Sequence, residues 1–78
     1  MNIKKDDIVK LNGGIEYLVV DIIDYNSNKY LYLARMDVDE FNLVKLDYKE
    51  NQMVFTSLNE DEYSQVIAIM SKQMLNDN

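Results

Sequence analysis

IEYLVVDIIDYNSNKYLYLARM, residues 15 to 36, is the stretch that decides the fold. Two apolar runs flank Asn26-Ser27-Asn28, and the runs are rich in Val, Ile, Leu and Tyr without any Pro or Gly, which is typical of β-strands. Asn and Ser favour turns because their short polar side chains hydrogen-bond to the local backbone. The stretch therefore predicts a β-hairpin.

The two faces of this hairpin follow from the alternation of side chains along a strand. A loop at Ser27-Asn28, or at the four residues 26–29, places three pairs opposite each other: Tyr25 and Tyr30, Ile23 and Tyr32, Ile22 and Leu33. An aliphatic face, which we expect to form the core, then holds Leu18, Val20, Ile22, Leu31 and Leu33. The opposite face holds Tyr17, Val19, Ile23, Tyr25, Tyr30, Tyr32, Ala34 and Met36, with Asp21 as its charge. Since neither face is polar, we expect the hairpin to lie centrally in a sheet.

Shorter elements surround the hairpin on both sides. We expect a strand at 7–11, then a turn at Asn12-Gly13-Gly14 whose glycines permit positive φ. After the hairpin strands, at 15–25 and 29–36, we expect strands at 41–48 and 53–57 and a helix over about 60–75. The chain, residues 1–78, is thus predicted to be a single α+β domain. Its five strands form an antiparallel meander or a small SH3-like open barrel, with one C-terminal helix.

The start of the helix has a clear signal. Asn59 and Glu62 have the spacing of a capping box, and Glu60 and Asp61 add negative charge where the helix dipole favours it. Further along, one set of residues recurs at helical spacing and predicts the buried stripe: Tyr63, Val66, Ile67, Met70 and Met74. Ile69 and Leu75 lie off this stripe.

The length and charge of the chain limit what it can be. A chain of 78 residues buries only about 60% of its unfolded surface, so a partner or a homodimer could add stability. The N-terminal residues contain no long apolar run typical of a signal peptide or an anchor. No stretch approaches the roughly 20 apolar residues that span a bilayer, and the net charge of -6 opposes anionic membranes. We therefore expect a cytoplasmic protein that does not bind membranes.

The residues that usually carry chemistry are missing. The sequence has no His and no Cys, and it has no Gly-rich phosphate loop. Asp37, Asp39 and Glu40 form an acidic loop, but the calcium loop of twelve residues needs Gly at position six and Glu at position twelve, and here position twelve is Tyr48. We expect a solvated loop there, and no catalytic residue, metal or cofactor. An enzyme based on carboxylates is a distant third hypothesis.

Two surfaces are candidates for binding a partner. One is an aromatic surface on the hairpin, made of Tyr17, Tyr25, Tyr30 and Tyr32, and the other is the acidic loop of Asp37, Asp39 and Glu40. The alternative for the tyrosines is that the helix covers them and they form core with their hydroxyls at the rim. Nucleic acid is an unfavourable partner, because eight basic residues face fourteen acidic ones. Binding it would require the basic side chains to gather on one side: Lys4, Lys5, Lys10, Lys29, Arg35 and Lys45.

The order of elements resembles a group of small acidic bacterial proteins known only as a domain of unknown function. The residues that carry this resemblance are 16–20, 29–33, 43–46 and 59–63, and it implies no catalytic residues. The opening, with KKDDIVKL before the glycines and YLVV after them, resembles the first strands of SH3-like barrels. We expect a non-enzymatic interaction module that binds a protein with a basic surface, as an inhibitor or nucleic-acid mimic of bacterial, phage or mobile-element origin. An SH3-like nucleic-acid-associated module is the alternative.

Overall fold

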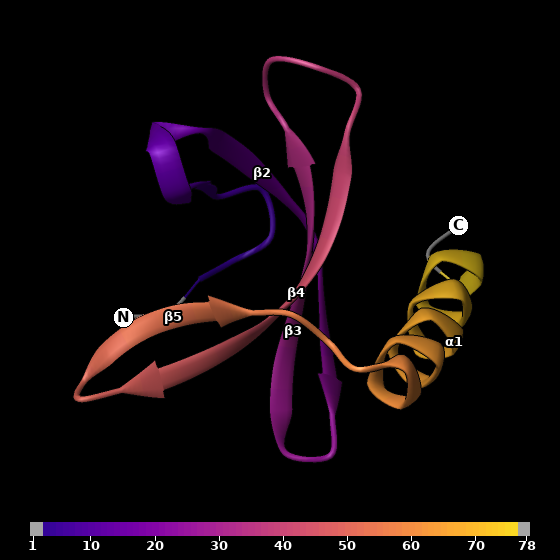
Figure 1. Ribbon diagram of the computed structural model, residues 1–78. Helices are drawn as coiled ribbons and strands as arrows, with labels where there is room; N and C mark the ends of the chain where they lie inside the picture. The colour runs from indigo at the N-terminus through magenta and orange to yellow at the C-terminus, as the bar shows by residue number, and fades with distance from the viewer. Residues whose placement is uncertain (1–2, 77–78) are drawn as a thin grey trace.

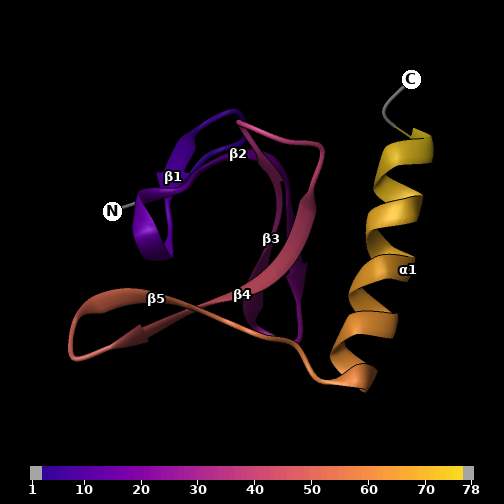
Figure 2. The same ribbon diagram turned by 45° about the horizontal axis from the view of Figure 1, so that its top comes forward.

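The computed structural model describes residues 3–76. Its elements are β1 (Ile8–Lys10), a 3-10 turn η1 (Asn12–Gly14), β2 (Glu16–Tyr25), β3 (Asn28–Arg35), β4 (Phe41–Lys49), β5 (Gln52–Thr56) and α1 (Glu60–Asn76). The strands form one antiparallel sheet in the order β1-β2-β3-β4-β5, which curls into a half-barrel with α1 outside it (Figures 1 and 2). The predicted α+β fold, a meander in the form of an SH3-like open barrel, is confirmed. Each strand and the helix begin and end within one residue of the predicted ranges.

The hairpin turn lies one residue earlier than expected. Asn26 and Ser27 form it, with φ of 53° and 65°, which is the backbone of a type I′ turn. Tyr25 therefore pairs with Asn28, and Ile23 pairs with Tyr30. The predicted pairing of Tyr25 with Tyr30 is wrong by two residues, and so are the other two predicted pairs, although a shift of two keeps each side chain on its face. The Tyr25 and Tyr30 rings are diagonal neighbours with centroids 6.3 Å apart.

A β-bulge at Val20 exchanges the two faces of the first half of β2. Val19 pairs with Leu33, but the next pair along the ladder is Asp21 with Tyr32, so Val20 has no partner on β3. One extra residue reverses the facing of all residues before it. Tyr17 and Val19 therefore lie in the core together with Leu31 and Leu33, and the prediction that placed Leu18 and Val20 there is wrong.

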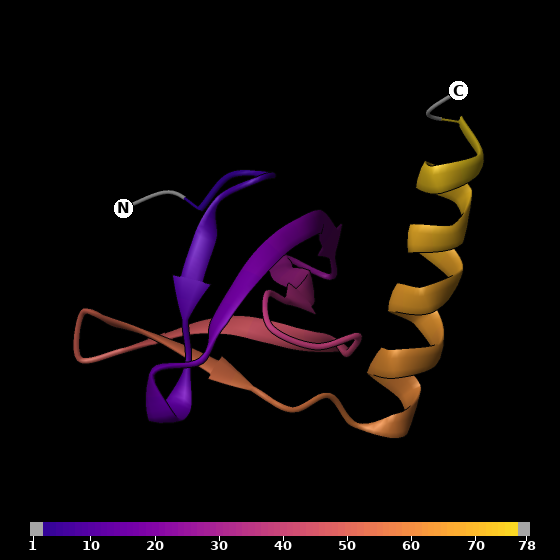
Figure 3. The same cartoon turned by 90° about the horizontal axis from the view of Figure 1, so that it is seen from above.

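The sheet separates two apolar cores. The inner core fills the concave side, and its buried residues are Tyr17, Val19, Leu31 and Leu33. The outer core lies between the convex side and α1, and its buried residues are Ile23, Tyr30, Val66 and Met70. Figure 3 shows α1 standing on one side of the sheet. Of the two alternatives for the tyrosine face, Tyr25, Tyr30 and Tyr32 follow the one in which the helix packs over them, whereas Tyr17 lies in the inner core.

The face that α1 presents to the sheet differs in part from the predicted stripe. Val66 and Met70 are buried as expected, but Tyr63 and Met74 are exposed. Ile69, which was expected off the stripe, packs against the outer core. In this orientation the helix also supplies partners for polar groups on the sheet: Gln73 Nε2 donates to Asp21 Oδ2 at 3.2 Å, and the Tyr30 hydroxyl donates to Glu62 Oε2 at 2.8 Å.

The start of α1 is capped as predicted. The Glu62 backbone N–H donates to Asn59 Oδ1 at 2.8 Å, and the Asn59 N–H donates to Glu62 Oε1 at 3.2 Å. These reciprocal bonds confirm the capping box. Within residues 3–76, no helix combines the length and the apolar character that a bilayer crossing requires.

Candidate functional site

Four strands bring four apolar side chains into one line on the convex side of the sheet. Ile8 pairs with Leu18, Leu18 with Ala34, and Ala34 with Phe41. Paired residues on neighbouring strands are only about 5 Å apart, so these side chains are contiguous. None of the four belongs to the inner or the outer core, and Ile8 and Phe41 at the two ends are exposed. We call this set the outer apolar row.

The outer apolar row lies next to the part of the sheet that α1 covers. The Phe41 ring stacks on the Tyr32 ring with centroids 5.5 Å apart and an angle of 9° between the planes. Tyr32 in turn packs against the outer core beneath the helix. The row exists because of the bulge at Val20, which turns Leu18 away from the inner core and toward the side of Ala34 and Phe41.

The acidic loop adjoins the Phe41 end of the row. Arg35 holds its two ends: Nε and Nη2 donate to the Asp37 carboxylate at 2.7 and 2.8 Å, and Nη1 lies 3.7 Å from Glu40 Oε2. The hydrogen bonds from Arg35 hold the pKa of Asp37 below its usual value. Asp39 makes no hydrogen bond or ion pair with any other residue in the part of the chain that the structure describes. Its carboxylate therefore carries a charge that no neighbouring side chain in the described part of the loop offsets.

Apolar side chains are also exposed within this loop. Met36 and Val38 lie on either side of Asp37, and both are exposed. Apolar and aromatic groups at the centre with charged groups around them are the usual composition of a protein interface. Met is well suited to such a place because its flexible side chain adapts to different surfaces.

The structure separates the tyrosines that the sequence grouped together. Tyr17 is buried in the inner core, where Asn42 Nδ2 donates to its hydroxyl at 3.4 Å. Tyr30 is buried under α1, and Tyr25 is half-buried beside it. Tyr17 and Tyr30 therefore offer no surface to a partner, which corrects their place in the predicted aromatic surface. Tyr32 is half-buried and joins the outer apolar row through Phe41.

Asp37, Asp39 and Glu40 lie together in one exposed loop, where the sequence placed them. Sequence reasoning missed Ile8, Leu18 and Phe41. Their alignment depends on the bulge and on the registers of three strand pairs, for which the sequence carries no local signal. Within residues 3–76, no group of three or more acidic side chains is arranged to hold a metal ion.

Glu62, near the start of α1, is a carboxylate with several polar partners. It accepts the Tyr30 hydroxyl and lies 3.3 Å from Lys45 Nζ. Burial and the hydrogen bond to the negatively charged Glu62 raise the pKa of Tyr30 to about 12. The Tyr30 hydroxyl, the Asn59 backbone and Lys45 together lower the pKa of Glu62. At neutral pH the tyrosine thus keeps its proton and the glutamate its charge, and their hydrogen bond attaches the helix to the sheet.

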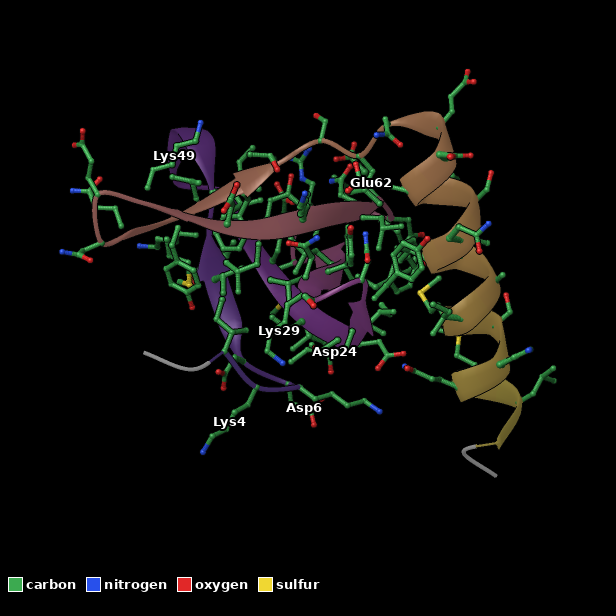
Figure 4. All side chains as sticks on the ribbon, turned by 90° about the horizontal axis from the view of Figure 1, so that it is seen from below. Lys4, Asp6, Asp24, Lys29, Lys49 and Glu62 are labelled. Atoms are coloured by element: carbon green, nitrogen blue, oxygen red, sulfur yellow. The ribbon has the colours of Figure 1, made fainter. Side chains whose placement is uncertain are left out.

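Several of the basic side chains considered for nucleic-acid binding are paired with carboxylates. Lys29 pairs with Asp24 at 2.9 Å, and Arg35 and Lys45 are paired as described above. Figure 4 shows Lys29 next to Asp24, and it shows Lys4 and Lys49 at opposite edges of the molecule. Three of the six basic residues considered for nucleic-acid binding are thus neutralised by neighbouring carboxylates.

No protein-family model matches the chain, and searches of curated proteins and of solved structures found no match. The resemblance to small acidic bacterial proteins and the expectations about partners stay predictions.

Proposed function

We propose that this chain is a non-enzymatic module that binds another protein through the outer apolar row and the acidic loop. The observation that carries the proposal is the row, in which Ile8, Leu18, Ala34 and Phe41 line up across four strands outside both cores. Contiguous apolar side chains on an exposed face are unfavourable in water and are typical of surfaces that a partner covers.

The charges around the row indicate the chemistry of the partner. Asp37, Asp39 and Glu40 border it at the Phe41 end. Complementary charge would come from Lys or Arg side chains around an apolar centre on the partner. A second copy of the chain is disfavoured, because each copy carries a net charge of -6.

An inhibitory role follows from the same surface. A partner with a basic site, such as one that binds nucleic acid, would meet the acidic loop as a substitute for phosphates, while Phe41 and Tyr32 supply the apolar contact. The charge of the loop and its fixed shape support this form of the proposal, since Arg35 holds Asp37 and Glu40 in place.

The test is affinity capture from a nuclease-treated lysate of the organism that encodes the chain. The tagged wild type is compared with Phe41→Ser and with the control Tyr48→Ser. The two aromatic side chains are 57% and 58% exposed, and they lie on β4 at positions that face opposite sides of the strand. Circular dichroism and urea unfolding establish that both variants are folded.

We expect the wild type and Tyr48→Ser to retain the same protein in stoichiometric amount. Phe41→Ser should bind that protein at least about tenfold more weakly, equivalent to about 1.4 kcal/mol of binding free energy. Raising the salt concentration should release the protein, because the acidic loop contributes to the contact. Equal retention by Phe41→Ser and the wild type would show that the row is not the interface. Retention of nucleic acid alone, when nuclease is omitted, would favour the nucleic-acid-associated module.

A further inference from the structure

The sheet has two edges, and β5 lacks the features that usually protect an edge. Proteins commonly guard edge strands with charges, Pro, bulges or very short length. β1 has three residues with Asp6 and Asp7 just before it. β5, with the sequence QMVFT, has five residues and contains no charge, no Pro and no residue of positive φ.

The free edge of β5 carries unpaired backbone groups at defined positions. The two-residue turn at Glu50-Asn51 pairs Lys49 with Gln52, and antiparallel pairs alternate between bonded and non-bonded types. The N–H and C=O groups of Met53 and Phe55 therefore point away from β4. Apart from the ladder to β4, no hydrogen bond to β5 occurs among residues 3–76.

A groove of about 640 Å³ runs beside this edge. The residues of 53–57 line one side, Lys10 and Leu11 line the opposite side, and Val44 also lines it. Leu11, Val44 and Phe55 belong to the margin of the inner core, so an apolar side chain entering the groove would extend that core. Figures 2 and 3 show β1 and β5 on the side of the sheet away from α1. The groove is thus separate from the part of the sheet that α1 covers.

We propose that an extended segment of a partner protein adds to β5 as a sixth antiparallel strand and fills this groove. The Met53 and Phe55 backbone groups would supply its hydrogen bonds, as in other cases of strand addition to a free edge. Lys10 and Leu11 line the side of the groove away from β5, so the occupant we propose is a single extended strand and not a sheet. A second copy is disfavoured, because its β5 is already part of a sheet and because each copy carries a net charge of -6.

The groove also defines the sequence that the segment should have. A strand matched to the five residues of β5 spans about five residues. Alternate side chains would enter the groove against Leu11, Val44 and Phe55 and should be apolar, while the others face solvent and can be polar. This inference is independent of the outer apolar row, which lies on the convex side of the sheet.

The test uses a phage-displayed library of random seven-residue peptides, selected on the wild type and counter-selected on Met53→Pro. Proline at position 53 removes an outward N–H and obstructs an added strand, but the bonds from β5 to β4 come from the neighbouring residues. Met53→Ala is the matched control, because it shortens the same side chain and keeps the N–H. Enriched peptides are synthesised both unmodified and with N-methyl groups on alternate amides.

We expect enriched sequences with alternating apolar residues that bind the wild type and Phe41→Ser alike and still bind Met53→Ala, which keeps the N–H but shortens a side chain lining the groove. Bound peptides should slow hydrogen exchange of the Met53 and Phe55 amides by about tenfold or more. Binding should be lost with Met53→Pro and with the peptide methylated on the amides that face β5. If Met53→Pro does not fold, the library is counter-selected on uncoated support. The comparison of unmodified with N-methylated peptides then tests the proposal without that variant.

Three results would overturn the proposal: no enrichment, peptides that bind equally well when methylated on either set of amides, or protection of Met53 that rises with protein concentration in the absence of peptide. The last result would mean that a second copy pairs with the edge. Because Phe41→Ser is predicted to bind these peptides normally, failure here and failure of the proposed function are distinguishable.

Discussion

The Tyr30 hydroxyl on β3 donates a 2.8 Å hydrogen bond to Oε2 of Glu62, the residue whose other carboxylate oxygen caps the start of α1. One side chain thus caps the start of the helix and attaches the helix to the sheet. Lys45 on β4, 3.3 Å from the same Oε2, completes the attachment. Figure 4 shows Glu62 at the point where the helix begins.

Removing the Tyr30 hydroxyl should weaken this attachment. Tyr30→Phe keeps the buried ring and loses one hydrogen bond to a charged acceptor, so the free energy of unfolding should fall by about 1 to 2 kcal/mol. Tyr25→Phe is the control, since the Tyr25 hydroxyl donates no hydrogen bond within the described chain. Urea unfolding measures both variants. A loss of equal size in both would mean that the contact with Glu62 contributes nothing specific.

The same contact predicts how stability changes at alkaline pH. The Tyr30 pKa is raised from 10.0 to about 12 in the folded protein. Between these values the unfolded chain has lost the tyrosine proton and the folded chain still holds it, so stability must fall as the pH rises. Urea unfolding from pH 9 to pH 11 should show a steeper decline for the wild type than for Tyr30→Phe. Parallel declines would contradict the raised pKa.

Two methionines on α1 test which face of the helix is buried. Met70 is 7% exposed in the outer core, whereas Met74, one turn later, is 44% exposed. Met70→Ala should lower the free energy of unfolding by about 2 to 3 kcal/mol, because it leaves a cavity against the sheet. Met74→Ala should change it by less than about 0.5 kcal/mol. Similar losses of unfolding free energy in the two variants, measured by thermal or urea unfolding, would mean that Met74 is buried like Met70, as the sequence predicts.

The β2–β3 turn offers a stabilising substitution. Ser27 has a φ of 65°, a conformation that costs a residue with a Cβ atom and suits Gly. Ser27→Gly should raise the free energy of unfolding by about 0.5 to 1 kcal/mol. Ser57→Gly, at an exposed position without positive φ, should lower stability or leave it unchanged. Destabilisation by Ser27→Gly would show that the turn is not of type I′.

Much of the fold could be predicted because it depends on local patterns. Alternation of apolar residues marks the strands, and the capping pair Asn59 and Glu62 marks the start of α1. The bulge could not be predicted, because Val20 is an ordinary strand residue in a continuous apolar run. Its single extra residue exchanges the roles of Leu18 and Val19, and with them the core and the surface of half of β2.

The candidate site was predictable only in its charged part. The acidic loop has three carboxylates within four residues, Asp37, Asp39 and Glu40, so any loop there places them close together. The apolar part joins Ile8 to Phe41 across the sheet, which requires three registers and the bulge to be known. The predicted aromatic surface is wrong for the same reason, because Tyr17 and Tyr30 share a face only in a hairpin without a bulge.

Photo-crosslinking from the outer apolar row tests the proposed interface directly. The photoreactive amino acid p-benzoylphenylalanine replaces Phe41 in one protein and Tyr48, of matching exposure, in the other. Each protein is irradiated in the lysate from which the wild type captures its partner. We predict that position 41 is linked to the captured protein and that position 48 is not. Equal or greater cross-linking from position 48, or none from position 41 while the partner is bound, would contradict this prediction.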